Sequence, residues 1–526
     1  MVHQSLLIGL HTAEGMRAMD AAAIAGIGIP GGRLMERAGL GVTREIIERY
    51  DPERVAVYAG KGNNGGDGFV VARELAGADV EVIVVVVAGR ESYKDDSLLN
   101  LQICERLGIP VIDGLPDEAD APDELRYPDL VVDAVFGTGF SGEPRGAAAA
   151  AIERILGTPA PVVAIDIASG VDASTGEVAG VAIAADLTVT MHAPKVGHFV
   201  TPGGALSGDV VVVPIGIPPS CRTEADVWLL TALGLAPLLR TKGALDHKRS
   251  VGTVLVVGGS RGMGGAAYMT AMGALRAGAG LVHCALPASA AADKPFLEVI
   301  TVPLPDEQAL GSASLAAVRE QVSGLKALAL GPGLGRSPET AAAVRELLRE
   351  PVPLLLDADG LYALDDELSP LAERPAPTVL TPHEGELGRL LGRAAADVAA
   401  HRLAAAREAA AMSGATILLK GEASIIADPA GDAYVVPTGN PGLATPGTGD
   451  VLSGVIVAQL AKGLAATDAA CLGGYLHGLA ADLAAQKVGT DGMIAGDLFA
   501  WLPPALELVK AGVEAGLDEE ALAHSE

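Results

Sequence analysis

Short runs of aliphatic residues alternate with glycine-rich, polar turns along the first half of the chain. The runs at residues 54–60, 80–89, 129–139, 161–172, 185–197 and 208–218 each contain a stretch of apolar residues beside a polar or glycine turn. Runs of this length are typical of buried strands, and residues 69–78 have the pattern of a helix. A strand, a glycine turn, a helix and a further strand form the repeating unit of a parallel sheet, so the pattern predicts an α/β domain.

The pattern loosens between residues 218 and 250 and then starts again. In the second half, apolar runs lead into polar turns at residues 252–265, 327–335, 352–360, 377–386 and 415–437, and an apolar helix is expected at 451–464. We therefore predict two α/β domains, one over residues 1–224 and one over residues 225–526. Ligands of open α/β sheets bind where the strands end, so we expect the chemistry in the polar turns.

Composition and charge narrow the classes of protein. The chain has 526 residues, of which 50% are apolar, and a formal net charge of −28. It lacks the basic face of a nucleic-acid binder, so we expect no nucleic-acid partner. No apolar run is long enough to span a bilayer, and no signal-peptide pattern is present, so we expect no membrane partner and a cytoplasmic location. Four scattered cysteines indicate neither a zinc site nor a disulfide framework.

The glycine-rich turn at Gly60–Gly68, with the sequence GKGNNGGDG, is the first candidate site. It does not match the usual dinucleotide fingerprint. Glycines nevertheless allow backbone N–H groups to approach a ligand, and a following helix presents its positive end to phosphate. Asn63, Asn64 and Asp67 add polar side chains. A tight turn with polar caps is the alternative, but the turn is long and polar, and we favour a ligand site.

Two aspartates at strand ends suggest a cation site. Asp133 and Asp166 each follow an apolar run. Together with Asn64 and the Ser169 hydroxyl, they would form an all-oxygen site that suits a hard cation. Each aspartate taken alone is more often a helix cap or a turn residue.

A second glycine-rich turn, PGTGDVLSG, lies in the far half of the chain. Backbone N–H groups at Gly447, Thr448 and Gly449 could form an anion hole for a phosphoryl group. Asp450, at the start of the expected helix, could then accept a proton from a substrate hydroxyl. The alternative is an aspartate that only caps the helix.

The first-half motifs, taken in order, resemble the NAD(P)H-hydrate epimerases. The motifs are MRAMDAAAIAGIGIPGGRLMERAG, GKGNNGGDGFVVAREL, DLVVDAVFGTGFSG, VVAIDIASGVDASTGEV and APKVG, within residues 10–218. The resemblance implies a Rossmann-like domain that interconverts the R and S epimers of hydrated NADH or NADPH. It implies a K⁺ ion held by Asn64, Asp133 and Ser169, and proton transfer by Asp166, with Lys195 a weaker candidate. It implies that the substrate contacts are Asn63, Asn64, Gly65, Gly66, Asp67, Gly137, Thr138, Gly139, Phe140, Ser141, Gly142, Glu143 and Asp166.

The second-half motifs resemble the ADP/ATP-dependent NAD(P)H-hydrate dehydratases. They include GTVLVVGGSRGMGGAA, LLLDADGLYAL, VLTPHEGELGRLL, LLKGEAS and GNPGLATPGTGDVLSG, within residues 240–505. The resemblance implies a ribokinase-like domain, with Mg²⁺, in which Asp450 is catalytic and ADP drives dehydration of the S epimer to NADH or NADPH, AMP and phosphate. It implies substrate contacts at Ala266, Gly333, His383 and Asp450, and nucleotide contacts at Lys420, Gly421, Glu422, Ala423, Ser424 and Gly449.

Four positions depart from the two family patterns. Ala168 replaces the proline of DIPSG, Pro446 replaces a glycine, Glu384 replaces the proline of HPGE, and Tyr362 replaces a frequent asparagine. Ala168 is less rigid than proline, which puts the position of Ser169 in question. Pro446 removes one N–H donor from the edge of the anion hole.

Together, the two halves predict a complete repair enzyme, because a dehydratase specific for one epimer would leave the other unused. Related proteins assemble, so we expect a homo-oligomer. One alternative is a kinase of a small hydroxylated vitamin or sugar, which would accumulate a stable phosphorylated product. Another is a first domain that binds nucleotide without catalysis, against which the set Asn64, Asp133, Asp166 and Ser169 argues.

Overall fold

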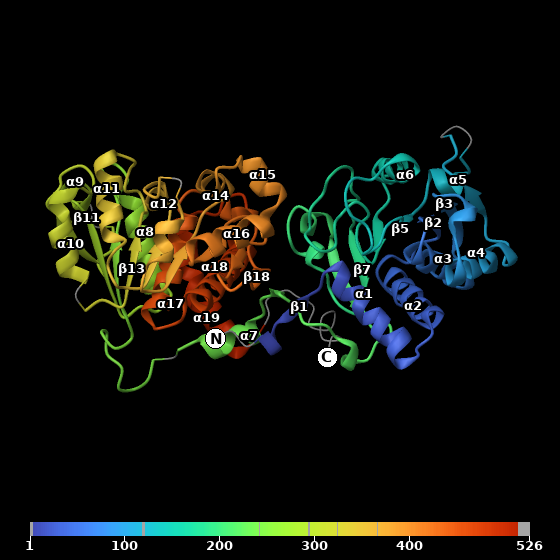
Figure 1. The fold of residues 1–526 in the computed structure, drawn as a ribbon, viewed down its shortest axis with the longest axis horizontal. Coiled ribbons are helices and arrows are strands. Elements are labelled where there is room, and N and C mark those ends of the chain that lie inside the picture. Colours follow the sequence, from blue (N-terminus) through green and yellow to red (C-terminus); the bar gives the residue numbers. More distant parts are fainter. Residues whose placement is uncertain are drawn as a thin grey trace. The chain divides into compact units, whose positions relative to one another are not determined.

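The computed structural model describes residues 4–117, 121–240, 242–292, 295–322, 324–365 and 367–513. The described chain forms two compact units (Figure 1). Residues 9–226 form the N-terminal unit, and residues 4–8 with residues 227–513 form the C-terminal unit. No helix in these ranges is long and apolar enough to cross a membrane.

The N-terminal unit is built on a seven-stranded parallel sheet with the order β4-β3-β2-β5-β6-β7-β8. Its strands are β2 (Arg54–Ala59), β3 (Glu81–Val86), β4 (Val111–Asp113), β5 (Leu130–Ala134), β6 (Val162–Ile165), β7 (Leu187–Met191) and β8 (Asp209–Val213). Its helices are α1 (Ala13–Ala21), α2 (Gly31–Tyr50), α3 (Asn63–Gly77), α4 (Asp95–Arg106), α5 (Asp123–Arg126) and α6 (Gly146–Leu156). The order reverses between β2 and β5, as in dinucleotide-binding sheets, and this confirms the predicted Rossmann-like class.

The C-terminal unit is built on an 11-stranded sheet with the order β1-β9-β18-β17-β16-β15-β14-β13-β10-β11-β12. Its strands are β1 (Ile8–Leu10), β9 (Val227–Leu229), β10 (Thr253–Val257), β11 (Leu281–Pro287), β12 (Ile300–Leu304), β13 (Ala327–Leu330), β14 (Leu354–Leu356), β15 (Thr378–Leu380), β16 (Thr416–Leu419), β17 (Ile425–Ala427) and β18 (Ala433–Val435). The sheet is parallel from β12 to β16 and antiparallel across β16, β17 and β18. The predicted α/β class holds for this half too, with the ribokinase-like combination of a parallel sheet and an antiparallel edge.

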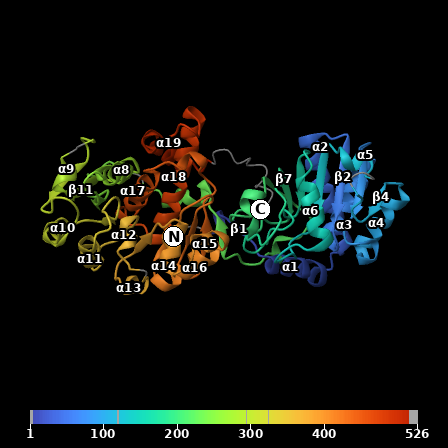
Figure 2. The ribbon, with the colours of Figure 1, turned by 90° about the horizontal axis from the view of Figure 1, so that it is seen from above.

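Helices complete the C-terminal unit. They are α7 (Ala232–Leu235), α8 (Gly264–Arg276), α9 (Ala288–Ala291), α10 (Leu315–Val322), α11 (Pro338–Leu347), α12 (Asp359–Tyr362), α13 (Ser369–Ala372), α14 (Glu384–Leu391), α15 (Ala395–Ala400), α16 (Arg402–Ser413), α17 (Thr448–Ala461), α18 (Ala466–Val488) and α19 (Leu498–Ala511). Several of them, among them α8, α16, α17 and α18, pack on the sheet. Helix α18 packs between α17 and α19 (Figure 2). Helix α17 is almost entirely buried, which explains why its sequence is apolar all round.

The first residues differ from the prediction of a domain over residues 1–224. Residues 4–8 belong to the C-terminal unit. The Thr231 hydroxyl donates to the Leu6 carbonyl at 2.8 Å, and the Gln4 amide donates to the Asp432 carboxylate at 3.0 Å. The segment is short and its partners lie more than 200 residues away in the sequence, so no local pattern reveals it.

Helix α3 also begins earlier than predicted. The sequence pattern placed residues 60–68 in a loop, but α3 starts at Asn63, so only residues 60–62 connect it to β2. The glycines of this stretch are required by close packing. A Cβ atom on Gly65 would lie 1.9 Å from the carbonyl oxygen of Gly60, and one on Gly68 would lie 2.7 Å from the Cβ of Ala134. Tertiary packing therefore overrides the weak helix propensity of asparagine and glycine.

Substitution of Gly65 tests this packing. We expect Gly65→Ala to destabilise the N-terminal unit by about 2–3 kcal/mol, because the added methyl group meets backbone that must move. Gly77→Ala, at the other end of the same helix, is the matched control because its Cβ would meet nothing within 4 Å. Urea unfolding gives the energies, and hydrogen exchange locates the loss in β2 and α3. Equal stability of the two variants would contradict this account.

Candidate active sites

Asn64, Asp133 and Ser169 meet around the backbone of Phe136 in the N-terminal unit. The Ser169 hydroxyl donates to Asp133 Oδ1 at 2.7 Å, and its backbone N–H donates to Asp133 Oδ2 at 2.8 Å. The Phe136 N–H donates to Ser169 Oγ at 2.8 Å, and Asn64 Nδ2 donates to the Phe136 carbonyl at 2.8 Å. Ala168 is fully buried beside Ser169, so the residue that replaces proline leaves the serine hydrogen-bonded to Asp133.

This group of residues has the donor chemistry of a hard-cation site. Asn64 Oδ1 is buried and has no hydrogen-bond partner. Asp133 is fully buried, and burial raises the pKa of its carboxyl group to about 6 in spite of its hydrogen bonds from Ser169 and Val135. A nearby cation would satisfy the amide oxygen and would also favour the ionised carboxylate. The oxygens of the amide, carboxylate, hydroxyl and main chain fit such an ion.

Asp166 lies in a different arrangement, around Lys195. Lys195 is fully buried, and its Nζ donates to Asp166 Oδ1 at 2.6 Å and to the Thr190 hydroxyl at 2.5 Å. The backbone N–H of Thr138 donates to Asp166 Oδ2 at 3.0 Å. Burial opposes ionisation of Asp166, but Lys195 and the hydrogen bonds from Lys195 and Thr138 hold its pKa well below the ordinary value. Asp133 and Asp166 therefore do not form one cation site as predicted, because Lys195 neutralises the charge of Asp166.

Three more of the predicted residues of this unit, Gly137, Phe140 and Asp67, lie near these two groups. A Cβ on Gly137 would lie 3.2 Å from both Asn64 and Asp166, so the loop of residues 137–143 begins between them. The ring of Phe140 stacks on that of Phe136 at 4.3 Å. Burial and the charge of Asp166 raise the pKa of Asp67 well above the ordinary value. Two carboxyl groups whose pKa values are shifted in opposite directions form an arrangement suited to acid and base roles.

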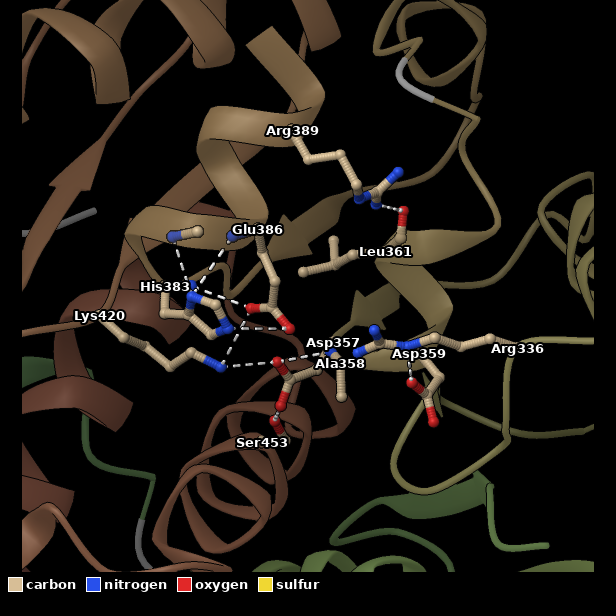
Figure 3. A network of polar contacts seen from close by, with 11 residues as sticks. Arg336, Asp357, Ala358, Asp359, Leu361, His383, Glu386, Arg389, Lys420 and Ser453 are labelled. Carbon is tan, nitrogen blue, oxygen red and sulfur yellow. Dashed lines mark hydrogen bonds and ion pairs between the residues drawn. The ribbon is translucent and has the colours of Figure 1, made fainter. Parts of the chain in front are cut away.

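In the C-terminal unit, Asp357 is the centre of the polar network in Figure 3. It follows β14 directly and is 1% exposed. Lys420 Nζ donates to Asp357 Oδ1 at 2.9 Å, and the Ser453 hydroxyl donates to Oδ2 at 2.6 Å. Sequence reasoning did not select Asp357, although an aspartate at the end of an apolar strand is the signal that identified Asp133 and Asp166.

Asp450 lies in the first turn of α17, near this network. Burial and the charge of Asp357 raise the pKa of Asp450 to about 7, against the opposing effect of Lys420. Burial lowers the pKa of Lys420, but Asp357 and Glu386 raise it to a net value above the ordinary one, so Lys420 carries its charge. A Cβ on Gly449 would lie 3.7 Å from Lys420 Nζ, and the charge of Lys420 acts on Asp450, so these three predicted residues lie together.

In the PGTGD turn, one of the three backbone N–H groups that were predicted to form the anion hole is already hydrogen-bonded. The Thr448 N–H donates to the Thr445 carbonyl at 3.4 Å. The backbone N–H groups of Gly447, Gly449 and Asp450 donate to no group of the described chain. An anion at the start of α17 would therefore meet these three N–H groups rather than the predicted set that includes Thr448.

His383 caps helix α14. Its Nδ1 accepts from the backbone N–H groups of Gly385 at 3.0 Å and Glu386 at 3.3 Å, which places the proton of a neutral ring on Nε2. Glu386 Oε2 accepts from the His383 N–H at 3.0 Å. His383 thus has the capping role of an ordinary polar residue, and its Nε2 lies 3.7 Å from Glu386 Oε1. Ala266 and Gly333 are neighbours, because a Cβ on Gly333 would lie 3.1 Å from that of Ala266.

Glu384, which stands where the family has proline, forms an ion pair with Arg402. Arg402 is 4% exposed, and its other terminal nitrogen lies 3.5 Å from the Lys420 carbonyl and 3.4 Å from that of Glu422. Arg402 therefore links the first turn of α14 to the loop of residues 420–424. The departure from the family pattern has a structural use, which is to neutralise a buried guanidinium beneath this loop.

Two α/β units, each with buried carboxylates at strand ends beside a glycine-rich helix start, define a two-site enzyme of the nucleotide-binding class. Residues 31–197 match the family model described as YjeF-related protein N-terminus, and residues 254–504 match that described as NAD(P)H-hydrate dehydratase. The chain belongs to the family of bifunctional NAD(P)H-hydrate repair enzymes.

Relatives match almost the whole chain. It is 42% identical to the bifunctional NAD(P)H-hydrate repair enzyme Nnr of Moorella thermoacetica, over 96% of this chain and 98% of that protein. It is 39% identical to the enzyme of the same name from Salinibacter ruber, over 94% and 95% of the two chains. A crystal structure of ADP/ATP-dependent NAD(P)H-hydrate dehydratase from Bacillus subtilis, co-crystallised with ATP and Mg²⁺, is 30% identical, with a TM-score of 0.47 over 53% of this chain and 98% of that one.

Removal of the Glu384 charge tests its pairing with Arg402. Loss of one partner of a buried ion pair leaves the other uncompensated, so we expect Glu384→Gln to destabilise the C-terminal unit by about 2 kcal/mol. The value is at the low end because the Glu384 side chain is 30% exposed. Glu373→Gln, at an exposed position, is the control. Thermal unfolding measures the difference, and a Glu384→Gln variant as stable as the control would show that the pair contributes nothing.

Proposed function

We propose that the chain repairs hydrated NADH and NADPH through two activities, one in each unit. The N-terminal unit interconverts the R and S epimers, and the C-terminal unit uses ADP to dehydrate the S epimer. Membership of the bifunctional repair family supports the pair of activities. The observation that carries the chemistry of the second site is the half-buried Asp450, with its pKa raised to about 7, in the same turn as unpaired N–H groups and close to Lys420.

In the N-terminal unit, we assign proton transfer to Asp166 and its positioning to Lys195. The two epimers differ at the carbon that carries the added hydroxyl group, so inversion requires proton transfers at the ring. Asp166 is ionised and buried, and Thr138 and Lys195 fix both of its oxygens. Asn63 to Asp67 and the loop Gly137–Glu143 bind the hydrated dinucleotide, and the Asp67 carboxyl group, whose pKa burial raises, is among these contacts.

A K⁺ ion is proposed at the group formed by Asn64, Asp133 and Ser169. The unpartnered oxygen of Asn64 and the buried carboxylate of Asp133 support this assignment. When bound, the ion supplies positive charge that orients anionic or carbonyl oxygens of the substrate. The residues themselves hold the loop that starts at Phe136 through the hydrogen bonds of Ser169 and Asn64.

In the C-terminal unit, Asp450 accepts the proton of the substrate hydroxyl. The hydroxyl oxygen attacks the terminal phosphorus of ADP, a new P–O bond forms, and the bond to AMP breaks. Loss of phosphate from the ring carbon and of a proton from its neighbour then restores the double bond of NADH or NADPH. N–H groups at the start of α17 stabilise the charge on the phosphoryl oxygens.

The remaining assignments follow the same geometry. Residues 420–424 and Gly449 bind ADP, with Lys420 held in place by Asp357 and charged throughout. Ala266, Gly333 and His383 contact the hydrated dinucleotide. Mg²⁺, which we propose accompanies the nucleotide, neutralises phosphate charge when bound. We further propose that the protein assembles as a homo-oligomer.

An assay with both epimers tests the proposed function. Purified protein is mixed with R and S hydrated NADH, Mg²⁺ and K⁺, and with ADP or ATP, and absorbance of NADH is followed. We expect complete conversion with ADP. Asp166→Asn should stop conversion when the S epimer is exhausted, because only epimerisation is lost. No conversion by the unaltered protein would overturn the proposal and favour a kinase of another hydroxylated substrate.

Two controls make this assay specific. The first control is Asp172→Asn. Asp172 lies in the turn that follows Asp166 and accepts a hydrogen bond from the Ser174 N–H, and the variant should convert both epimers. Replacement of K⁺ by Na⁺ should slow epimerisation and leave dehydration unchanged. Full conversion by Asp166→Asn would show that another group transfers the proton, and Lys195 would be the next candidate.

The pH dependence of dehydration tests the role of Asp450. Because a general base must be unprotonated, and burial raises the pKa of Asp450 to about 7, kcat/KM should rise with pH up to about 7 and level off above it. The rise should approach tenfold per pH unit well below the pKa. The S epimer is used alone, so that epimerisation does not contribute, and circular dichroism verifies folding at each pH. A flat profile between about pH 5.5 and 8.5 would contradict Asp450 as the base.

A further inference from the structure

Two arginines and one tyrosine form a cluster at the dehydratase site that the reaction described above does not use. The guanidinium carbons of Arg336 and Arg389 lie over the ring of Tyr362, 5.3 Å and 5.1 Å from its centre. Arg336 comes from the turn before α11, Tyr362 ends α12, and Arg389 lies on α14. We call these three residues the Arg–Tyr–Arg cluster. Tyr362 is the residue that departs from the family pattern.

The Arg–Tyr–Arg cluster borders the proposed site. Arg336 Nε donates to Asp359 Oδ1 at 2.7 Å, and the Gly335 N–H donates to Asp359 Oδ2 at 2.9 Å. Asp359 is close enough to Asp450 to contribute to its raised pKa. Arg389 Nη2 donates to the Leu361 carbonyl at 2.8 Å. Figure 3 draws Arg336 and Arg389 in the same view as Lys420 and Asp357.

The cluster brings two guanidinium groups together on a strongly acidic chain, whose net charge is −28, and Asp359 forms an ion pair with Arg336. Each guanidinium is fixed by a hydrogen bond to its surroundings and by the tyrosine ring. The Arg336 side chain is 61% exposed, and its terminal nitrogens donate to no group of the described chain. The fixed guanidinium of Arg336, with its unused terminal donors, matches the oxygens of a phosphate group, and Arg389 adds a second positive charge beside it.

We propose that the Arg–Tyr–Arg cluster binds a phosphate group of the hydrated dinucleotide. This inference rests on the proposed function of the C-terminal site. The dinucleotide is favoured over ADP because of the neighbours of each arginine. Arg336 is three residues beyond Gly333, and Arg389 is on the helix that His383 caps. Gly333 and His383 are both proposed dinucleotide contacts. The proposed ADP contacts lie instead on the loop that follows β16 and at the start of α17.

Kinetics of Arg336→Gln, Arg389→Gln and the double variant test the proposal. With saturating ADP, the double variant should raise KM for the dinucleotide about tenfold or more while kcat stays within about twofold, because charged hydrogen bonds are lost away from the reacting atoms. KM for ADP should not change. A rise in KM for hydrated NADPH alone would identify its 2′-phosphate as the bound group. A rise in KM for both hydrated NADH and hydrated NADPH would identify the pyrophosphate. Arg336→Lys should restore part of the affinity.

Controls separate this proposal from stability and from the proposed function. Arg319→Gln removes an exposed arginine that pairs with Glu346 and Glu350 elsewhere in the unit, and should leave every constant unchanged. Thermal unfolding should be the same for all variants. Calorimetric binding of NADP⁺ and NAD⁺ needs no turnover, so weaker binding by the double variant would support the cluster even if the unaltered protein converts no substrate. Unchanged dinucleotide KM and binding, or a rise in KM for ADP alone, would overturn the proposal.

Discussion

A carboxylate buried at the end of a parallel strand must be compensated, and both sites of this protein are organised by that requirement. An uncompensated buried charge is costly, so each carboxylate collects donors around it. Asp133 accepts hydrogen bonds from Ser169, and Asp166 accepts them from Lys195 and Thr138. Asp357 accepts them from Lys420 and Ser453. The donors come from segments far apart in the sequence. The requirement therefore fixes the loops that would otherwise be free to move.

The different partners give these carboxylates different chemistry. Lys195 holds the pKa of Asp166 low, whereas Asp133, which has only neutral donors, has its pKa raised to about 6 by burial. Burial and the charge of Asp357 raise the pKa of Asp450 to about 7, against the opposing effect of Lys420. The same residue type thus serves as an ionised acceptor, a candidate cation ligand and a candidate base, according to its neighbours.

The sequence pattern predicted the class of both sheets because parallel strands buried on both faces read as continuous apolar runs. It also selected Asp133, Asp166 and Asp450. It placed the start of α3 six residues late, because the glycines that begin this helix are explained only by contacts with β5 and with Gly60. It missed Asp357, whose role depends on Lys420 and Ser453 from other elements. The partners of Glu384 and Tyr362, two departures from the family pattern, are likewise visible only in three dimensions.

The path of the first residues has a consequence for how the chain is made. Because residues 4–8 join the unit formed by residues 227–513, the N-terminal unit is an insertion within a discontinuous one. During synthesis from the N-terminus, β1 must wait for more than 200 residues before β9, its neighbour in the sheet, leaves the ribosome. A fragment that starts at Val227 would expose the edge of β9, which is an aggregation hazard. The two activities are therefore joined more closely than a single linker would join them, since no single cut in the chain releases both units whole.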